Sequence, residues 1–172
     1  MAKSIKQEKL FTTSPNKLYK FYMDEKVHSD ITGKKAKIGT KPGESFSAFN
    51  GEIKGKLLHT IKNKLIVQTW RYKNWDKTTL DSVVTITLKE NEDGTTVVSL
   101  YHSNIPEDHL DAVKKGWTAA YWKAWKQYLT NPPVKSTKTA KQGKTKKASS
   151  AAKTRQTKKT TRNTAKTNLT VT

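Results

Sequence analysis

The stretch from Ile105 to Leu129, IPEDHLDAVKKGWTAAYWKAWKQYL, constrains the fold most, because its apolar spacing predicts one long amphipathic helix. Pro106 suits the first helical turn, where its missing N–H is not needed, and Pro132 and Pro133 stop the helix. Three of the five tryptophans of the chain lie here, and aromatic side chains bury large areas. We therefore expect this helix to anchor the core through two adjacent apolar rows, which are Leu110, Val113, Trp117, Tyr121, Ala124 and Tyr128 in one row and Trp122, Trp125 and Leu129 in the other.

The N-terminal part predicts one strand and two short helices. A weak strand at 3–12 precedes a helix that Ser14 caps and Pro15 begins. A second short helix over 24–32 is expected to end at Gly33, because glycine adopts the left-handed conformation that closes many helices.

The middle of the chain predicts an antiparallel sheet. Segment 34–49 predicts two strands joined by a turn at Lys41-Pro42-Gly43, and Asn50-Gly51 is typical of a hairpin turn. Further strands are expected at 52–62, 65–72, 82–90 and 95–103, and 65–72 is apolar on both faces, so its register stays open. An apolar sheet face must be covered, and only the C-terminal helix is long enough to do it. We therefore predict an α+β domain with the sheet wrapped around that helix.

The positive charge is concentrated at the C-terminal end. The chain has 34 Lys and Arg against 14 Asp and Glu, and segment 132–172 holds twelve of the bases and no acid. This segment lacks aromatic residues, so we expect a folded domain over 1–131 and a disordered basic tail over 132–172. Such a tail predicts non-specific nucleic-acid binding, with solubility alone, an anionic membrane surface or an acidic protein as alternatives. The predicted nucleic-acid-binding residues are Lys135, Lys138, Lys141, Lys144, Lys146, Lys147, Lys153, Arg155, Lys158, Lys159, Arg162 and Lys166.

The sequence gives no pattern for catalysis, a metal or a cofactor. It has no cysteine, which excludes disulfides and thiolate zinc sites, and its four histidines do not have metal-ligand spacing. No G-x-S-x-G motif and no glycine-rich phosphate loop is present. The N-terminus has no apolar signal segment, and no run approaches the ~20 apolar residues of a membrane span. We expect a cytoplasmic protein without a membrane span. Association with the nucleoid is an alternative within this expectation.

Several short motifs occur in an order that resembles a known superfamily. They are Phe46–Leu57 (F-x-x-F-x-G-x-I-x-G-K-L), Thr69-Trp70-Arg71, Asp93-Gly94-Thr95, His102-Ser103, Ile105-Pro106 and Gly116-Trp117 before the Trp-rich helix. Over residues 5–130 the chain resembles the START-like helix-grip superfamily abbreviated SRPBCC, and within it the C-terminal domain of the activator of the heat-shock protein 90 ATPase. The resemblance implies a sheet that grips the C-terminal helix, with a hydrophobic cavity between them. Many members bind lipids or small molecules, and a minority act as cochaperones.

The alternation of apolar residues predicts which side chains face this space. Inward positions on two strands and the helix, with one tryptophan of the middle strand, give the candidate ligand-binding residues Trp70, Val84, Ile86, Val98, Leu100, His102, Val113, Trp117 and Tyr121. The residues alone allow plain core packing as readily as a cavity, and the resemblance favours the cavity.

Three functions follow from these observations. The first hypothesis is a non-enzymatic binding protein, with a small apolar ligand or a client protein at the domain and nucleic acid at the tail. The second is a cochaperone-like regulator that resembles the heat-shock protein 90 ATPase activator. The third is an enzyme of the cyclase or hydrolase kind found elsewhere in the superfamily, for which only His102 and Tyr121 are candidate polar groups.

Overall fold

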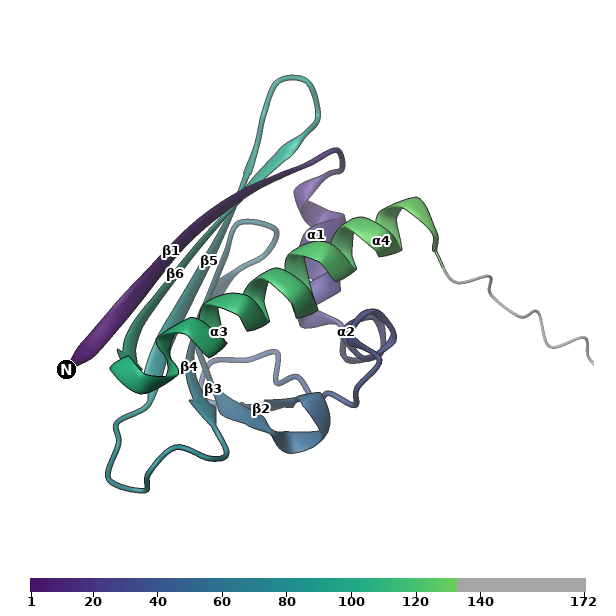
Figure 1. The fold of residues 1–172 in the computed structure, drawn as a ribbon. Helices are drawn as coiled ribbons and strands as arrows, with labels where there is room; N and C mark the ends of the chain where they lie inside the picture. Colours follow the sequence, from purple (N-terminus) through teal and green to yellow (C-terminus); the bar gives the residue numbers. More distant parts are fainter. Residues whose placement is uncertain (133–172) are drawn as a thin grey trace, which may run out of the picture. The chain divides into compact units, whose positions relative to one another are not determined.

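A six-stranded antiparallel sheet forms the larger layer of the domain. The computed structural model describes residues 1–132. The sheet has the order β1-β6-β5-β4-β3-β2 (Figure 1). Its strands are β1 (Ala2–Phe11), β2 (Ser45–Ala48), β3 (Ile53–Ile61), β4 (Leu65–Tyr72), β5 (Ser82–Glu90) and β6 (Thr96–Pro106). The strands β4, β5 and β6 follow one another in the chain, so most of the sheet is built from neighbouring segments, with a longer loop over 73–81 between β4 and β5 and a short turn between β5 and β6.

One long helical run crosses the concave face of the sheet, and two short helices lie at one end of it (Figure 1). The run consists of α3 (Leu110–Gly116), a π-helical segment (Trp117–Lys123) and α4 (Ala124–Thr130). The short helices are α1 (Pro15–Met23) and α2 (Glu25–Thr32). Gly33 ends α2 with a φ of 67°, as the sequence predicts. No helix within residues 1–132 is long and apolar enough to cross a membrane.

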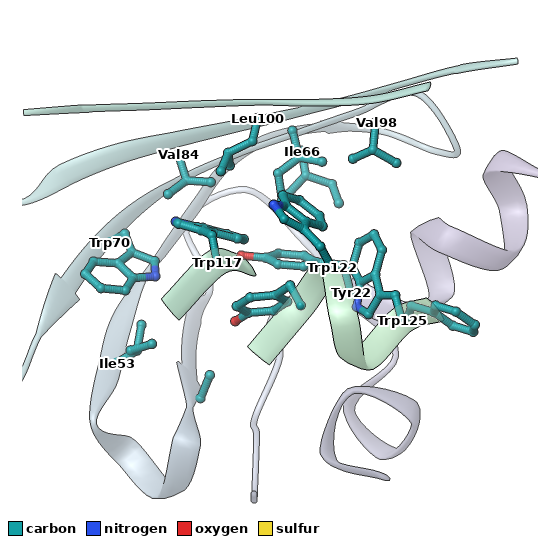
Figure 2. Packing of buried hydrophobic residues seen from close by; sticks show 14 of the residues in the cluster. Tyr22, Ile53, Ile66, Trp70, Val84, Val98, Leu100, Trp117, Trp122 and Trp125 are labelled. Carbon is teal, nitrogen blue, oxygen red and sulfur yellow. The ribbon is translucent and has the colours of Figure 1, made fainter. Parts of the chain in front are cut away.

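The core lies between the sheet and the long helical run. Val84 and Leu100 project from β5 and β6 toward Trp117 and Trp122 of the helix (Figure 2). The π-helical segment widens the helix, and in a π-helix the side chains five residues apart lie above one another. Trp117 and Trp122 accordingly stack with ring centroids 5.7 Å apart. This wider turn places Trp117 and Trp122, which belong to different apolar rows, side by side in the core.

The register of β4, which the sequence leaves open, is set by one buried face. Ile66, Gln68 and Trp70 point into the core and are at most 3% exposed. Gln68 is tolerated there because its side-chain nitrogen donates to the Tyr22 hydroxyl at 2.6 Å. The predicted curved antiparallel sheet around a C-terminal helix is confirmed, including a strand over 82–90 with Val84, Ile86 and Leu88 buried.

The predicted start of the long helix at Ile105 and Pro106 is wrong. Both residues belong to β6, where Ile105 pairs with Lys3 and Pro106 pairs with Ala2 of β1. On the other side of β6, pairing with β5 reaches only as far as Ser103. Pro106 thus has one strand neighbour, and a proline is acceptable at such an edge position because no second ladder needs its N–H. A 3₁₀ turn, Glu107–His109, then leads into α3.

The first of the two strands predicted within 34–49 is also wrong. Only one isolated bridge, between Lys37 and Ser47, precedes β2. The backbone N–H groups of Thr40 and Lys41 instead donate to the Glu44 carboxylate at 2.7 and 3.1 Å. Such local side-chain acceptors compete with strand pairing, so the segment forms a loop. The predicted tail over 132–172 lies, apart from Pro132, outside the described residues.

Candidate ligand cavity and its surroundings

A cavity of about 320 Å³ lies between the N-terminal half of the long helical run and the end of β4. Trp70 and Tyr72 of β4 and Trp75 of the following loop form one wall. The opposite wall consists of Val113, Trp117 and Tyr121 from the helical run, and Phe49 and Ile53 complete the lining on the β2–β3 side. The volume is at the lower end of the range of ligand pockets, about 300–1,000 Å³, so the cavity suits a compact molecule.

Small residues on the helix open the cavity to solvent. Ala112, Gly116 and Ala120 follow one another at intervals of four along the helix and line the cavity, and Ala112 and Gly116 are exposed. A Cβ atom added to Gly116 would meet nothing within 4 Å. Asn74, also exposed, lies on the opposite side of the opening. Larger side chains at Ala112, Gly116 and Ala120 would close this opening.

Two indole donors of residues that line the cavity have no hydrogen-bond partner among the described residues. The Nε1 atoms of Trp70 and Trp75 are buried without a hydrogen bond. Their rings lie 5.5 Å apart between centroids. Figure 2 shows the indole nitrogen of Trp70 on the side of the ring that faces the helix. Leaving a buried donor unpaired costs about 1–3 kcal/mol, so two such groups in one cavity are an exception that needs a physical reason.

Two titratable groups of the cavity lining have defined states or partners. Burial raises the pKa of the Tyr121 phenol well above its usual value of 10, so this hydroxyl stays neutral. His109 is half-buried, its ring centroid lies 5.9 Å from that of Trp75, and its Nε2 lies 3.6 Å from an Asp108 carboxylate oxygen. No Lys, Arg, Asp or Glu lines the cavity in the part of the chain that the structure describes. The wall is therefore mainly aromatic and apolar, with Asn74 and His109 as polar residues in its lining.

His102 lies beside the cavity in a closed hydrogen-bond chain. Its Nδ1 accepts from Trp117 Nε1 at 3.0 Å, and its Nε2 lies 2.7 Å from the Ser82 hydroxyl. Ser82 in turn donates to the Trp70 carbonyl at 2.7 Å. An indole nitrogen can only donate, so the proton of the neutral His102 must be on Nε2, which donates to Ser82. Burial lowers the pKa of His102 to about 3, so its ring is neutral at neutral pH.

The structure brings four of the nine predicted ligand residues to the cavity. Trp70, Val113, Trp117 and Tyr121 line it. The other five are fully buried and do not line the cavity. They belong to the closed core between sheet and helix, and they are Val84, Ile86, Val98, Leu100 and His102. Sequence reasoning missed Trp75 and Tyr72. Its one available signal was a tryptophan inside the polar loop around 74–78, since a large aromatic side chain in a loop usually finds a place to be buried.

The remaining sequence predictions concern metal ligation and the basic residues. No group of three or more His, Cys, Asp or Glu residues that could hold a metal ion occurs within residues 1–132. The twelve basic residues predicted to bind nucleic acid, Lys135 to Lys166, lie outside the described part of the chain. Within the described part, the exposed side of the long helical run carries Lys114, Lys115 and Lys123, which border a shallow hollow together with Asp111.

Comparison with known proteins finds one family model, which matches residues 12–130 and is described as "Activator of Hsp90 ATPase homolog 1-like protein". A human relative, "Activator of 90 kDa heat shock protein ATPase homolog 1", is 25% identical over 117 residues, which are 68% of this chain and 34% of the relative. A Dictyostelium discoideum homologue with the corresponding name is 30% identical over 115 residues, which are 67% of this chain and 30% of the relative. The chain thus spans about a third of the length of these curated relatives.

Solved structures show the same architecture. The crystal structure of an HSP90 activator from Plasmodium falciparum superposes with a TM-score of 0.70 at 26% identity, over 75% of this chain and 97% of that one. The solution structure of the Aha1 dimer from Colwellia psychrerythraea gives a TM-score of 0.64 at 20% identity, over 74% of this chain and 96% of that one. The second likeness concerns the fold alone.

Proposed function

The chain belongs to the Activator of Hsp90 ATPase homolog 1-like family, and on this premise we propose that it is a non-enzymatic binding protein that regulates a heat-shock protein 90 ATPase. One observation carries the proposal: the family match covers residues 12–130, which is almost all of the described domain. Two curated relatives are named as activators of this ATPase, and the matched region makes up only 34% and 30% of their lengths. The activity of those longer proteins is therefore what the experiment must test in this single domain.

The chemistry of the domain supports binding over turnover. His102 is neutral, and both of its nitrogens are engaged by Trp117 and Ser82, so it is not free to exchange a proton with a substrate. The Tyr121 phenol is held neutral by burial. These two residues were the candidate polar groups for an enzyme, and neither has the free partner that acid–base catalysis requires.

The exposed lysines of the long helical run supply a contact surface for the chaperone. Lys114, Lys115 and Lys123 are all exposed on the side of the helix that faces away from the sheet. Among residues 1–132, Asp111 is the one carboxylate that borders the same hollow. A patch with this excess of positive charge fits an acidic surface and would guide its approach. We assign this patch, the helix lysines, as the surface that contacts the chaperone.

We expect the purified chain to raise the steady-state ATP hydrolysis rate of a heat-shock protein 90 chaperone. The triple variant Lys114→Glu, Lys115→Glu, Lys123→Glu should need a concentration at least about tenfold higher for half-maximal stimulation. An exposed ion pair contributes up to about 1 kcal/mol, and ~1.4 kcal/mol corresponds to tenfold. The measurement is a coupled ATPase assay in which the chain is titrated at low and at high salt.

The matched control makes the same three Lys→Glu changes on the sheet. Lys6→Glu, Lys54→Glu, Lys56→Glu alters three exposed lysines on β1 and β3 and should leave the half-maximal concentration within about twofold of that of the unmodified chain. Equal losses in both triple variants would show that total charge matters and the helix lysines do not. A chain that leaves the ATPase rate unchanged at saturating concentration would refute the regulatory function itself.

The cavity favours a second candidate function, the binding of a small apolar ligand. The supporting observation is an open, aromatic-walled space of about 320 Å³ at the position where four of the predicted residues meet. Under this proposal Trp70, Val113, Trp117 and Tyr121 contact the ligand. The closed-core residues Val84, Ile86, Val98, Leu100 and His102 hold the walls in place without touching it.

The basic tail over 132–172 remains a predicted nucleic-acid-binding segment. Twelve cations without a carboxylate should bind duplex DNA non-specifically, with a dissociation constant of about 10⁻⁴–10⁻⁶ M at physiological salt. The test compares the full chain with a version that ends at Asn131 on random-sequence duplex DNA across a salt series. We expect a steep salt dependence, with a log–log slope of about 0.9 per neutralised phosphate, for the full chain alone. Equal binding by both versions would remove the tail from this function.

A further inference from the structure

The Tyr121 hydroxyl is a polar group of the cavity lining that the fold leaves without a partner. The side chain is 4% exposed, and its hydroxyl makes no hydrogen bond with any other residue of 1–132. Within the same residues, the side-chain polar atoms that lack both a partner and solvent contact belong to His28, Asn63, Trp70 and Trp75. The Tyr121 oxygen is not one of them, so it keeps contact with solvent, and the cavity that Tyr121 lines is where this contact occurs.

The neighbouring polar groups show that the fold satisfies aromatic donors and acceptors in its closed core. The Tyr22 and Tyr121 rings lie 5.7 Å apart between centroids, yet the Tyr22 hydroxyl accepts from Gln68 Nε2 at 2.6 Å. The indole nitrogen of Trp117, which lines the same cavity, donates to His102 Nδ1 at 3.0 Å. Tyr121 differs from both because its hydroxyl is unpaired and reachable from the cavity.

The Tyr121 ring is held in one orientation by aromatic neighbours. Its centroid lies 4.6 Å from that of Trp117, 5.6 Å from that of His28 and 5.8 Å from that of Phe49. The His28 and Phe49 contacts are edge-on, a favourable arrangement of two rings. A side chain that is already ordered loses little conformational freedom when a ligand binds, so the hydroxyl is preorganised as a contact.

The rest of the lining limits which ligand suits this hydroxyl. Because burial raises the pKa of Tyr121, its phenol keeps its proton and can donate a hydrogen bond as well as accept one. No Lys, Arg, Asp or Glu of residues 1–132 lines the cavity, so a charged ligand would lose its hydration without a balancing charge. A purely apolar ligand would expel solvent and leave the hydroxyl unpaired, which is unfavourable.

We infer that the cavity binds a compact, flat, uncharged molecule whose hydroxyl or carbonyl group hydrogen-bonds to the Tyr121 hydroxyl, with the apolar body of the molecule against the aromatic walls. The inference rests on the second candidate function, ligand binding, which it deepens, and it does not depend on the chaperone.

The test titrates the full chain with three probes that share a two-ring body: 2-naphthol, naphthalene and 2-naphthoate. In the unmodified chain, calorimetry should show tighter binding of 2-naphthol than of 2-naphthoate. Tyr121→Phe keeps the ring and removes the hydroxyl. The ratio of the 2-naphthol affinity to the naphthalene affinity should therefore fall by about three- to tenfold in this variant, the effect of one net hydrogen bond. Comparing ratios cancels the difference in hydrophobicity between the two probes.

Thermal melts separate a binding role of the hydroxyl from a structural one. Because this hydroxyl has no partner in the fold, Tyr121→Phe should leave the melting midpoint within about 2 °C of that of the unmodified chain. The matched control, Tyr22→Phe, removes the hydroxyl that pairs with the buried Gln68 and should lower the midpoint by at least about 3 °C.

A second pair of variants tests whether the probes enter this cavity. Gly116→Leu places a side chain in open space at the entrance, where an added Cβ atom would meet nothing within 4 Å, and it should weaken the binding of all three probes. Lys115→Leu adds the same side chain at the preceding exposed position, which does not line the cavity, and should leave the three affinities unchanged.

The probes and variants distinguish a failure of the Tyr121 contact from a failure of ligand binding. An unchanged affinity ratio in Tyr121→Phe, or a midpoint as low as that of Tyr22→Phe, would overturn the role of the hydroxyl while ligand binding stands. Tighter binding of 2-naphthoate would overturn the uncharged chemistry. Binding of none of the probes, or binding that Gly116→Leu leaves unaltered, would overturn ligand binding at this cavity. The chaperone ATPase assay reports separately on the regulatory function.

Discussion

Replacing Trp125 by alanine should lower the free energy of unfolding by about 3–5 kcal/mol, the cost of emptying a large aromatic site in a core. Trp125 is 1% exposed and lies on α4. Its ring contacts Phe11 of β1 and Phe21 of α1, with centroids 5.7 and 5.9 Å away. One side chain thus joins the sheet, a short helix and the long helical run. Urea unfolding followed by circular dichroism at low temperature measures the loss as a shift of the midpoint.

Two substitutions on the same helix serve as controls for this result. Trp125→Phe keeps a ring and should recover most of the lost stability, since smaller volume changes leave smaller cavities. Lys126→Ala, at the next and exposed position, should change the free energy of unfolding by no more than about 0.5 kcal/mol. A loss below about 1 kcal/mol in Trp125→Ala would show that the long helical run does not anchor the core.

The strands of this fold could be predicted because their signal is local. In β5 the alternation of Val84, Ile86 and Leu88 with Thr85 and Thr87 predicts which face of the strand is buried. In the structure these three apolar side chains are buried. β4 could not be oriented in this way, because LIVQTWRY is apolar on both faces. Its buried face includes the polar Gln68, which is satisfied by a distant partner, the Tyr22 hydroxyl of α1. The alternation of residues within one β-strand contains no information about a partner on another element.

The start of the long helix shows the limit of local signals more clearly. Pro106 followed by acidic residues is typical of a helix N-terminus. Pairing of Ile105 with Lys3 of β1, more than a hundred residues earlier, keeps this segment in β6 instead. The π-helical segment Trp117–Lys123 is a second case that local spacing does not predict. Stacking of Trp117 on Trp122 stabilises this wider helical turn. Tertiary contacts decide both cases.

The candidate site was predictable in part for a related reason. The helix positions Val113, Trp117 and Tyr121 follow from spacing, and Trp70 from its place in a middle strand. Trp75 reaches the cavity by the path of a loop, which no periodicity describes. The predicted resemblance to the heat-shock protein 90 ATPase activator domain is confirmed by the family match over residues 12–130. Weak motifs in a fixed order thus indicated the family, whereas the open part of the cavity needed coordinates.

Lowering the pH from 6.5 to about 4.5 should destabilise the domain through its buried histidines. Burial lowers the pKa of His102 from 6.5 to about 3 in the folded chain. The unfolded chain therefore takes up a proton near pH 6.5 that the folded chain refuses, and this favours unfolding. His102 alone should reduce the free energy of unfolding by about 1.4 kcal/mol for each pH unit below 6.5. The stabilisation is complete above pH 6.5 and is lost progressively toward pH 3.

The window above about pH 5.5 isolates the histidines from the carboxylates. Hydrogen bonds and nearby cations lower the pKa values of Glu44, Asp76, Asp93 and Glu107 in the folded chain, so their contribution to stability is lost only as the pH falls toward their unfolded values of 4.5 for Glu and 3.8 for Asp. Burial also lowers the pKa of His28, which adds to the loss in the same window. The slope of unfolding free energy against pH between 6.5 and about 5.5 therefore reports the protons that the unfolded chain takes up on histidines and the folded chain does not.

His102→Gln tests the share that belongs to His102. The glutamine carbonyl can accept from Trp117 Nε1 and its amide can donate toward Ser82, so the hydrogen-bond chain has a substitute that does not titrate. Urea unfolding at several pH values should show a slope shallower by about one proton, or ~1.4 kcal/mol per pH unit, in the variant. An unchanged slope would mean that the folded domain accepts the proton on His102. Trp117 would then have to give up its acceptor on Nδ1, because an imidazolium ring can only donate.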